Sequence, residues 1–227
     1  MKREELIKRI TNNLGEIEET ENEIICRVDI SRVKNLEDKY SITCTGISDE
    51  YLVLVNEYGL NKKIVYVLDG VELNHKKIRI LGIGKCDIII RNSRINANAL
   101  DIMNNEGSIT IEDTTINKLM AWSTLYANKM LIRNTNIFSM SSGKTFRLCL
   151  AAFEYLGMSD SNIEILNAMV EIAPENSLSI VDTKVTGPFK VGNTQTMEAN
   201  SLILNIETDL SSLEKWKNLE YKTLKRK

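Results

Sequence analysis

The sequence predicts an all-β fold: a parallel β-helix that coils at about 21–24 residues per turn, with an α-helix at each end. Three observations support this prediction. A short strand-like segment recurs along the chain, each copy ends in an Asn or Asp followed by Ser or Thr, and both termini show helical spacing of apolar residues. Repeats too short to bury their own apolar side must stack on one another, which is the defining property of a solenoid.

The repeat is nine residues long and alternates apolar and polar positions before it reaches the Asx–Ser/Thr pair. Because side chains alternate in a strand, we expect one side of each copy to point into the core. The inward stack is predicted to comprise Ile90, Ile111, Ile132, Met158 and Ile180. The five copies begin at Asp87, Ser108, Lys129, Tyr155 and Ser177, which gives spacings of 21, 21, 26 and 22 residues.

The Asx residues are predicted to form tight corners, because Asn and Asp tolerate the left-handed backbone region. Asn92 and Asn134 are therefore expected to have left-handed backbone dihedrals. A third apolar stretch in each turn, followed by a second Asx corner, indicates a three-sided coil. The second corner is expected at Asn105, Asn128, Asn176 and Asn200.

These corners over residues 62–206 resemble the right-handed parallel β-helix of the pectate-lyase-like superfamily. The resemblance implies a right-handed coil. It leaves the function open, since that superfamily includes lyases, hydrolases, epimerases, phage tailspikes and proteins without catalysis.

The regular β-helix is predicted over 62–208, after irregular first turns in 22–61 that include a short helix near 31–37. Residues 1–21 are predicted to form an N-terminal helical cap, with Leu6, Ile7, Ile10, Leu14 and Ile17 on one face. Residues 209–227 are predicted to form a C-terminal capping helix with Leu213, Trp216 and Leu224 on its apolar face.

Composition argues against several classes of partner. The net charge is −2 and no basic stripe is visible, so we expect no nucleic-acid binding. No apolar run approaches the ~20 residues of a membrane-spanning helix, and the start of the chain lacks a signal peptide. The four cysteines and one histidine are too scattered for a zinc site, so we expect reduced thiols, a cytoplasmic location, and no metal or cofactor.

One outward column of charges is the candidate binding site. Arg91, Glu112 and Arg133 occupy the same place in three successive repeats. The first interpretation is structural, with charges pairing between turns. The second is an anion or partner site that uses the two arginines. Glu112 is the sole carboxylate among the fifteen outward positions compared, whereas glycoside hydrolysis needs two, so no catalytic residue is predicted.

Other motifs are interpreted as structural. The segment 141–145 is similar to the end of a phosphate-binding loop, but Phe138 stands where that motif needs glycine. The run from Gly82 to Lys85 is expected to be a corner, and His75 to lie in a solvated loop. Trp122 and Trp216 are expected to be packing residues, and exposed rows of aromatic side chains are expected to be missing.

The leading hypothesis is therefore a non-catalytic cytoplasmic scaffold or protein-interaction module whose partner is a protein, either another copy of the chain or a different one. The first alternative is a carbohydrate-active protein of lyase or hydrolase type. The second is a structural or counter-defence protein of a phage or mobile element, in keeping with an Ile-, Asn- and Lys-rich, AT-rich bacterial or phage genome. Oligomeric state and the role of the 138–154 insertion stay open.

Overall fold

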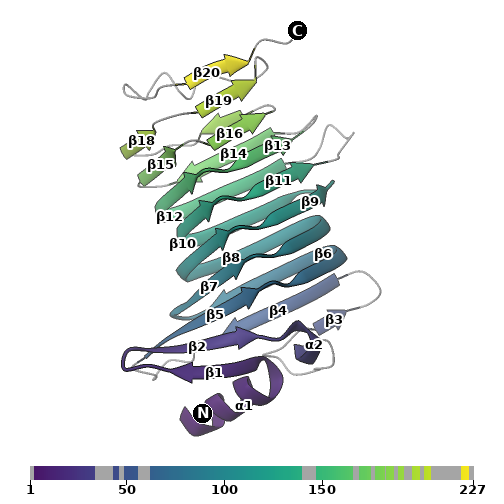
Figure 1. Cartoon of the computed structure of the whole chain (residues 1–227), viewed down its shortest axis with the longest axis vertical. Helices are drawn as coiled ribbons and strands as arrows, with labels where there is room; N and C mark the ends of the chain where they lie inside the picture. The colour runs from purple at the N-terminus through teal and green to yellow at the C-terminus, as the bar shows by residue number, and fades with distance from the viewer. Residues whose placement is uncertain are drawn as a thin grey trace.

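The computed structural model describes residues 3–33, 43–45, 49–55, 62–139, 147–165, 169–174, 177–181, 183–186, 189–191, 196–199, 202–205 and 221–224. Its strands stack one above another from the N-terminal to the C-terminal end (Figure 1). Almost all neighbours are parallel. The chain is thus mostly β and forms a β-solenoid, as predicted.

Strand pairing divides each turn into three segments, called here the first, second and third faces. Some strands bend from one face to the next. The first face comprises β2 (Glu23–Val28), β5 (Lys63–Asp69), β7 (Cys86–Arg91), the ends of β8 (Arg94–Glu112), β10 (Ser123–Arg133) and β12 (Arg147–Ser159), then β15 (Ser177–Val181) and β18 (Thr196–Ala199).

The second and third faces complete each turn. The second comprises the start of β6 (Glu72–Ile83) and of β8, then β9 (Thr115–Leu119), β11 (Asn136–Ser139), β13 (Asn162–Ile165), β16 (Thr183–Thr186), β19 (Leu202–Asn205) and β20 (Tyr221–Leu224). The third comprises β4 (Asp49–Val55), the end of β6, the middle of β8, the starts of β10 and β12, β14 (Met169–Pro174) and β17 (Phe189–Val191).

The predicted inward stack is confirmed where the structure describes it. Ile90 pairs with Ile111, Ile111 with Ile132, and Ile132 with Met158, so the register follows the repeat in the sequence. All four side chains are at most 2% exposed. The side chain of Ile180 lies outside the described residues. Burying each such side chain is worth roughly 1.5–3 kcal/mol, so the stack is a main source of stability.

The first corner has the predicted left-handed backbone. The φ angles of Asn92, Asp113, Asn134 and Asp160 are 50°, 49°, 44° and 49°. Gly70 has φ 64° at the same place one turn earlier. Asn and Asp reach this region at lower cost than other side chains, which explains why the corner admits little else.

A buried hydroxyl follows each of the four Asn and Asp corner residues and joins consecutive turns. Thr114 Oγ1 donates to the carbonyl of Glu112 at 2.8 Å and accepts the N–H of Ser93 at 3.4 Å. Ser93 makes the same pair of contacts with Arg91 and Val71. The hydroxyl thus satisfies backbone groups that the corner removes from strand pairing.

The second corner lies where it was predicted in the described turns, but it does not break the strand. Asn105 and Asn128 lie within continuous strands, and the strand register shifts at Asn128, between residues 127 and 129. In β8 the buried Asn104 makes the bend, since its Nδ2 donates to the carbonyls of Cys86 and Ser108 at 2.9 and 3.0 Å. Asn176 and Asn200 lie outside the described residues.

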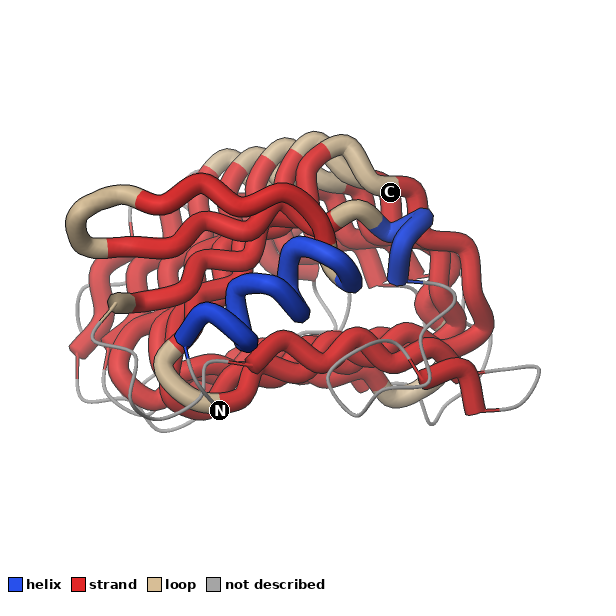
Figure 2. Tube along the Cα trace, turned by 90° about the horizontal axis from the view of Figure 1, so that it is seen from below, coloured by secondary structure: helices blue, strands red, loops and turns tan. Residues whose placement is uncertain are grey.

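The N-terminal helix is shorter than predicted. Helix α1 (Arg3–Asn13) is followed by β1 (Gly15–Glu19), which pairs antiparallel with β2. A Cβ at Gly15 would lie 1.8 Å from the carbonyl oxygen of Arg27, so only glycine permits this approach and the helix ends before it. Ile10 and Leu14 are buried against the core, and α1 crosses the N-terminal end of the solenoid (Figure 2).

The C-terminal helix prediction is wrong where it can be compared. Residues 221–224, including Leu224, form strand β20, which pairs in parallel with β19. Leu213 and Trp216 lie outside the described residues. Near the other end, the short helix expected near 31–37 is present as α2 (Ile30–Val33), and β3 (Thr43–Thr45) pairs antiparallel with β4.

Candidate functional site

The three residues of the predicted charged column are aligned as expected, but they do not form the expected ion pairs with one another. Arg91, Glu112 and Arg133 are register partners on the first face. Arg91 instead binds Asp69 of the preceding turn, with Nη2 2.7 Å from Oδ2. Among the described residues, no ion pair joins Glu112 to either arginine. Asp69 was not predicted from the sequence, because the repeat is only weakly preserved around residues 65–70. It nevertheless occupies the position equivalent to Arg91 one turn earlier.

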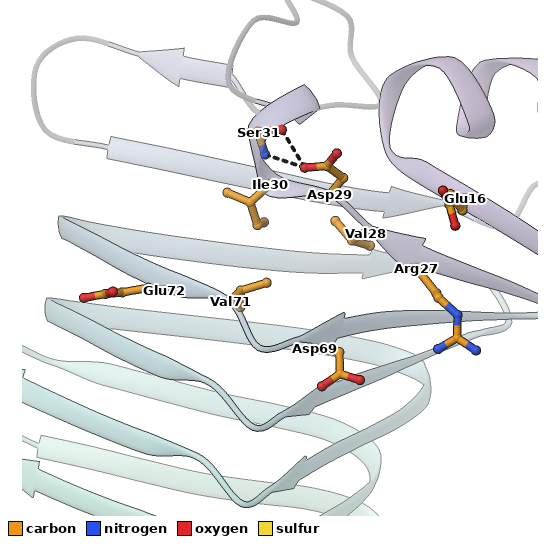
Figure 3. Close-up of a pocket in the computed structure, with 9 residues that line it drawn as sticks. All are labelled: Glu16, Arg27, Val28, Asp29, Ile30, Ser31, Asp69, Val71 and Glu72. Carbon is orange, nitrogen blue, oxygen red and sulfur yellow. Dashed lines mark hydrogen bonds between the residues drawn. The ribbon is translucent and has the colours of Figure 1, made fainter.

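A pocket of about 410 Å³ adjoins Asp69 at the N-terminal end (Figure 3). Val28, Ile30 and Val71 supply its apolar wall. Its charged lining residues come from four segments of the chain, namely β1, the β2–α2 region, β5 and β6. These residues are Glu16, Arg27, Asp29, Asp69 and Glu72.

Several of these charged groups already have partners within the chain. Asp29 accepts hydrogen bonds from the backbone N–H and hydroxyl of Ser31 at 2.9 and 2.6 Å. Asn92 donates to Asp69 at 2.9 Å. This bond, followed by that from Arg91, lowers the pKa of Asp69 below its ordinary value. A general acid requires a raised pKa, so Asp69 is held in the state opposite to that role.

The outward side of the second face, called the outer second face, carries a ladder of asparagines. Asn96 Nδ2 donates to Asn74 Oδ1 at 2.5 Å, and Asn117 Nδ2 donates to Asn96 Oδ1 at 3.3 Å. These residues are register partners on three successive turns. These three asparagines therefore satisfy one another's polar groups across the three turns, whereas the buried Oδ1 of Asn162, further along the same face, has no hydrogen-bond partner.

The outward side of the third face, called the outer third face, is apolar by comparison. Ile83, Met103, Trp122 and Phe153 are 50%, 38%, 60% and 50% exposed. Ile83, Met103 and Phe153 come from strands β6, β8 and β12, and Trp122 immediately precedes β10. Half-buried apolar side chains lie beside them at positions 81, 99, 126 and 151. In the strand register, positions 81, 103, 126 and 151 form one apolar column, whereas the polar residues at 79, 101 and 124 form the next column. An exposed apolar column of this kind is a feature of interaction sites.

This arrangement overturns one expectation. Trp122 is not a packing residue of the core, because 60% of it is exposed. Trp122 and Phe153 are both exposed on this side but lie at different positions along their strands, so they do not form a row of aromatic side chains. The sequence did not reveal that Trp122 is exposed, because apolar residues in 121–126 occur at both alternating positions.

Polar groups also lie on and beside the outer third face. Arg79 and Asp101 form an ion pair with Nε 2.9 Å from Oδ2. At one edge Lys129 and Asn128 bind Glu154 at 2.9 and 3.2 Å. The Lys129 contact lowers the pKa of Glu154.

The remaining sequence candidates carry no site in the described residues. The segment 141–145 lies outside them. His75 was expected in a loop but lies within strand β6, and its side chain is not among the described ones. Gly84 has φ 77° and sits in a bend before β7, as expected for a corner. The stretch after the phosphate-loop-like segment is strand β12.

Cys26, Cys86 and Cys149 are free thiols. Burial raises the pKa of both Cys26 and Cys86 to about 12, which makes them poor nucleophiles and poor metal ligands. Within the described residues, no His, Cys, Asp and Glu side chains gather in a group that could hold a metal ion. The described helices are all too short or too polar to cross a bilayer.

Comparisons of this chain with protein families, with curated proteins and with solved structures found no match.

Proposed function

We propose that this chain is a non-catalytic, cytoplasmic β-solenoid that serves as a protein-interaction module. The observation that supports the proposal is the outer third face, where apolar side chains from four neighbouring turns are exposed. The solenoid holds these side chains at fixed strand spacings, so the surface is ordered before any partner arrives. A rigid apolar surface loses little conformational entropy on binding.

Two finer structural features belong to the same proposal. We infer a right-handed coil, since parallel crossovers take that hand in ≈ 98% of cases. We also infer that α1 acts as a cap, because an open end would expose core residues such as Ile24 and invite pairing with other chains. Burial of Ile10 and Leu14 against the core supports this role.

A photo-reactive phenylalanine analogue tests the proposal directly. Placed at Met103, it should form covalent adducts with a polypeptide in the cells that naturally make this protein. The matched control carries the same analogue at Asn96, on the outer second face, and should form few or none. Equal adduct yields at both positions, or none at Met103, would show that the outer third face is not an interaction surface.

Carbohydrate binding is a second candidate, supported by two observations. Trp122 and Phe153 are exposed on one face, as sugar-stacking platforms are. The N-terminal pocket is lined by four carboxylates, from Glu16, Asp29, Asp69 and Glu72. Screening against pectin, alginate and similar polysaccharides decides between the candidates. Binding that is lost on Trp122→Ala, or cleavage lost on Glu16→Gln or Glu72→Gln, would replace the protein-interaction proposal.

A further inference from the structure

We propose that the occupant of the outer third face is a second copy of this chain, packed face to face about a two-fold axis that runs along the strands. This inference rests on the proposed function and names its partner. Such an axis reverses the order of turns, so the two solenoids run in opposite directions. The argument is the self-complementarity of the outer third face.

The outward side chains form columns, because the strands pair in register. Leu81, Met103, Tyr126 and Ala151 occupy one column on β6, β8, β10 and β12. An axis between β8 and β10 places Met103 of one copy over Tyr126 of the other. The same operation places Leu81 over Ala151, so a large side chain meets a small one.

Neighbouring columns match in the same way. Continuing the register, Ile83 lies over Phe153 of the other copy, and Ala99 lies over Trp122. Exposed apolar groups thus cover one another, and the largest aromatic faces the smallest apolar residue. A two-fold interface requires this reciprocity of each contact.

Polar positions also coincide with polar positions. Asp101 lies over Thr124 of the other copy, where the hydroxyl can donate to the carboxylate. Asn105 lies over Asn128, and two amides can exchange hydrogen bonds. Neither Asn105 nor Thr124 has a side-chain hydrogen bond to another described residue, so pairing between copies disrupts no contact of theirs, whereas Asn128 already donates to Glu154. The match is poorer at one edge, because the same operation places Arg79 over Cys149 and, continuing the register, Lys77 over Arg147.

The available area suits a weak dimer. Six third-face strands, β4 to β14, at ~4.8 Å each and seven residues at ~3.3 Å give a surface of roughly 29 by 23 Å. That is roughly 670 Å² per copy, below the ~800 Å² that each partner buries in a standard interface.

Sedimentation velocity of the full chain tests the inference. The native chain should be a dimer at about 10–100 μM, the range in which weak interfaces of this size assemble. Met103→Glu should weaken the dimer at least about 30-fold, since it buries a carboxylate near the axis twice. The control Thr110→Glu, on the first-face segment of the same strand, should leave the dimer intact. Unchanged thermal unfolding of both variants shows that the fold survives.

A mixture of two variants tests the register itself. Met103→Glu and Tyr126→Lys should each be monomeric alone. Mixed, they should form a heterodimer, because one Met–Tyr contact is kept and the other becomes a Glu–Lys pair. A native chain that stays monomeric, or variants that fail to recover when mixed, would overturn the two-fold arrangement. Photo-adducts from Met103 to a different protein would then still support the proposed function, whereas no adducts would remove both.

Discussion

The outer second and outer third faces belong to the same turns, yet the side chains of one hydrogen-bond to each other and those of the other remain exposed. On the outer second face, Asn74, Asn96 and Asn117 hydrogen-bond to one another across three turns. On the outer third face, Met103 and Trp122 remain exposed. Both faces share one core, so folding does not require this difference. Asparagines that hydrogen-bond to one another gain little from a partner, whereas exposed apolar side chains gain stability when a partner covers them.

The largest expected difference in stability is between truncation of a core side chain and truncation of a side chain on the outer third face. Ile132→Ala should lower the free energy of unfolding by about 2–5 kcal/mol, because it leaves a cavity in the middle of the inward stack. Met103→Ala should change it by less than about 0.5 kcal/mol in the isolated monomer. Denaturant unfolding at low protein concentration measures both. Equal losses would mean that the outer third face is part of the core, and the comparison would fail.

The next effect contrasts a buried hydroxyl with an outward one. Thr114→Val should cost about 1–3 kcal/mol, since the carbonyl of Glu112 and the N–H of Ser93 each lose a partner in a buried corner. Thr124→Val, on the outer third face, should stay within about 0.5 kcal/mol. Chemical denaturation of the two variants gives the answer, and a large loss for Thr124→Val would show that the outer third face is already satisfied internally.

A smaller difference is expected between two asparagines. Asn96→Ala removes the central rung of the asparagine ladder and should cost about 0.5–1.5 kcal/mol. Asn105→Ala, which has no such ladder, should cost less than about 0.5 kcal/mol. Thermal unfolding of the monomer is sensitive enough to separate them. If the two losses are the same, the ladder contributes nothing to the outer second face.

The smallest effect depends on pH and involves Asp69, beside the second face. Its pKa is lowered in the folded protein, so its contribution to stability is present above the ordinary pKa of ~3.9 and is lost as the pH falls through the lower folded value. Its side chain is 37% exposed, so the contribution should be only about 0–1 kcal/mol. The stability gap between native chain and Asp69→Asn should therefore shrink below about pH 4. A stability gap that widens below about pH 4 would show that ionised Asp69 destabilises the folded protein.

The parts of the fold that could be predicted are those with local causes. Asn92 and Asn134 identified the first corner, because a left-handed backbone selects the residue type regardless of surroundings. The alternation around Ile111 identified the inward side for the same reason. Asn105 and Asn128 identified the place of the second corner, but not that the strand runs on through it, because the contact of Asn104 with Cys86 there spans 18 positions of the chain.

The candidate site was not predictable for a different reason. In 121–126 apolar residues occupy both alternating positions, and only pairing with neighbouring turns decides that Leu125 points inward and Trp122 outward. Asp69 could have been found, since it sits one turn before Arg91 at the equivalent position. Leu224 was placed on a helix by its spacing, but strand pairing with β19 outweighs local propensity there.

Consecutive turns stack in the same way, so the solenoid can be lengthened or shortened by one whole turn at a time. Residues 113–133 span one turn, from the corner at Asp113 to the last residue of β10. Removing them joins Glu112 to Asn134. Asn134 then takes the corner position of Asp113, and Ile111 packs against Met158 in place of Ile132. Each turn contacts only its neighbours, so the remaining stack keeps its register. Tandem duplication or loss of a single gene segment can therefore lengthen or shorten such a protein without redesign of its interior.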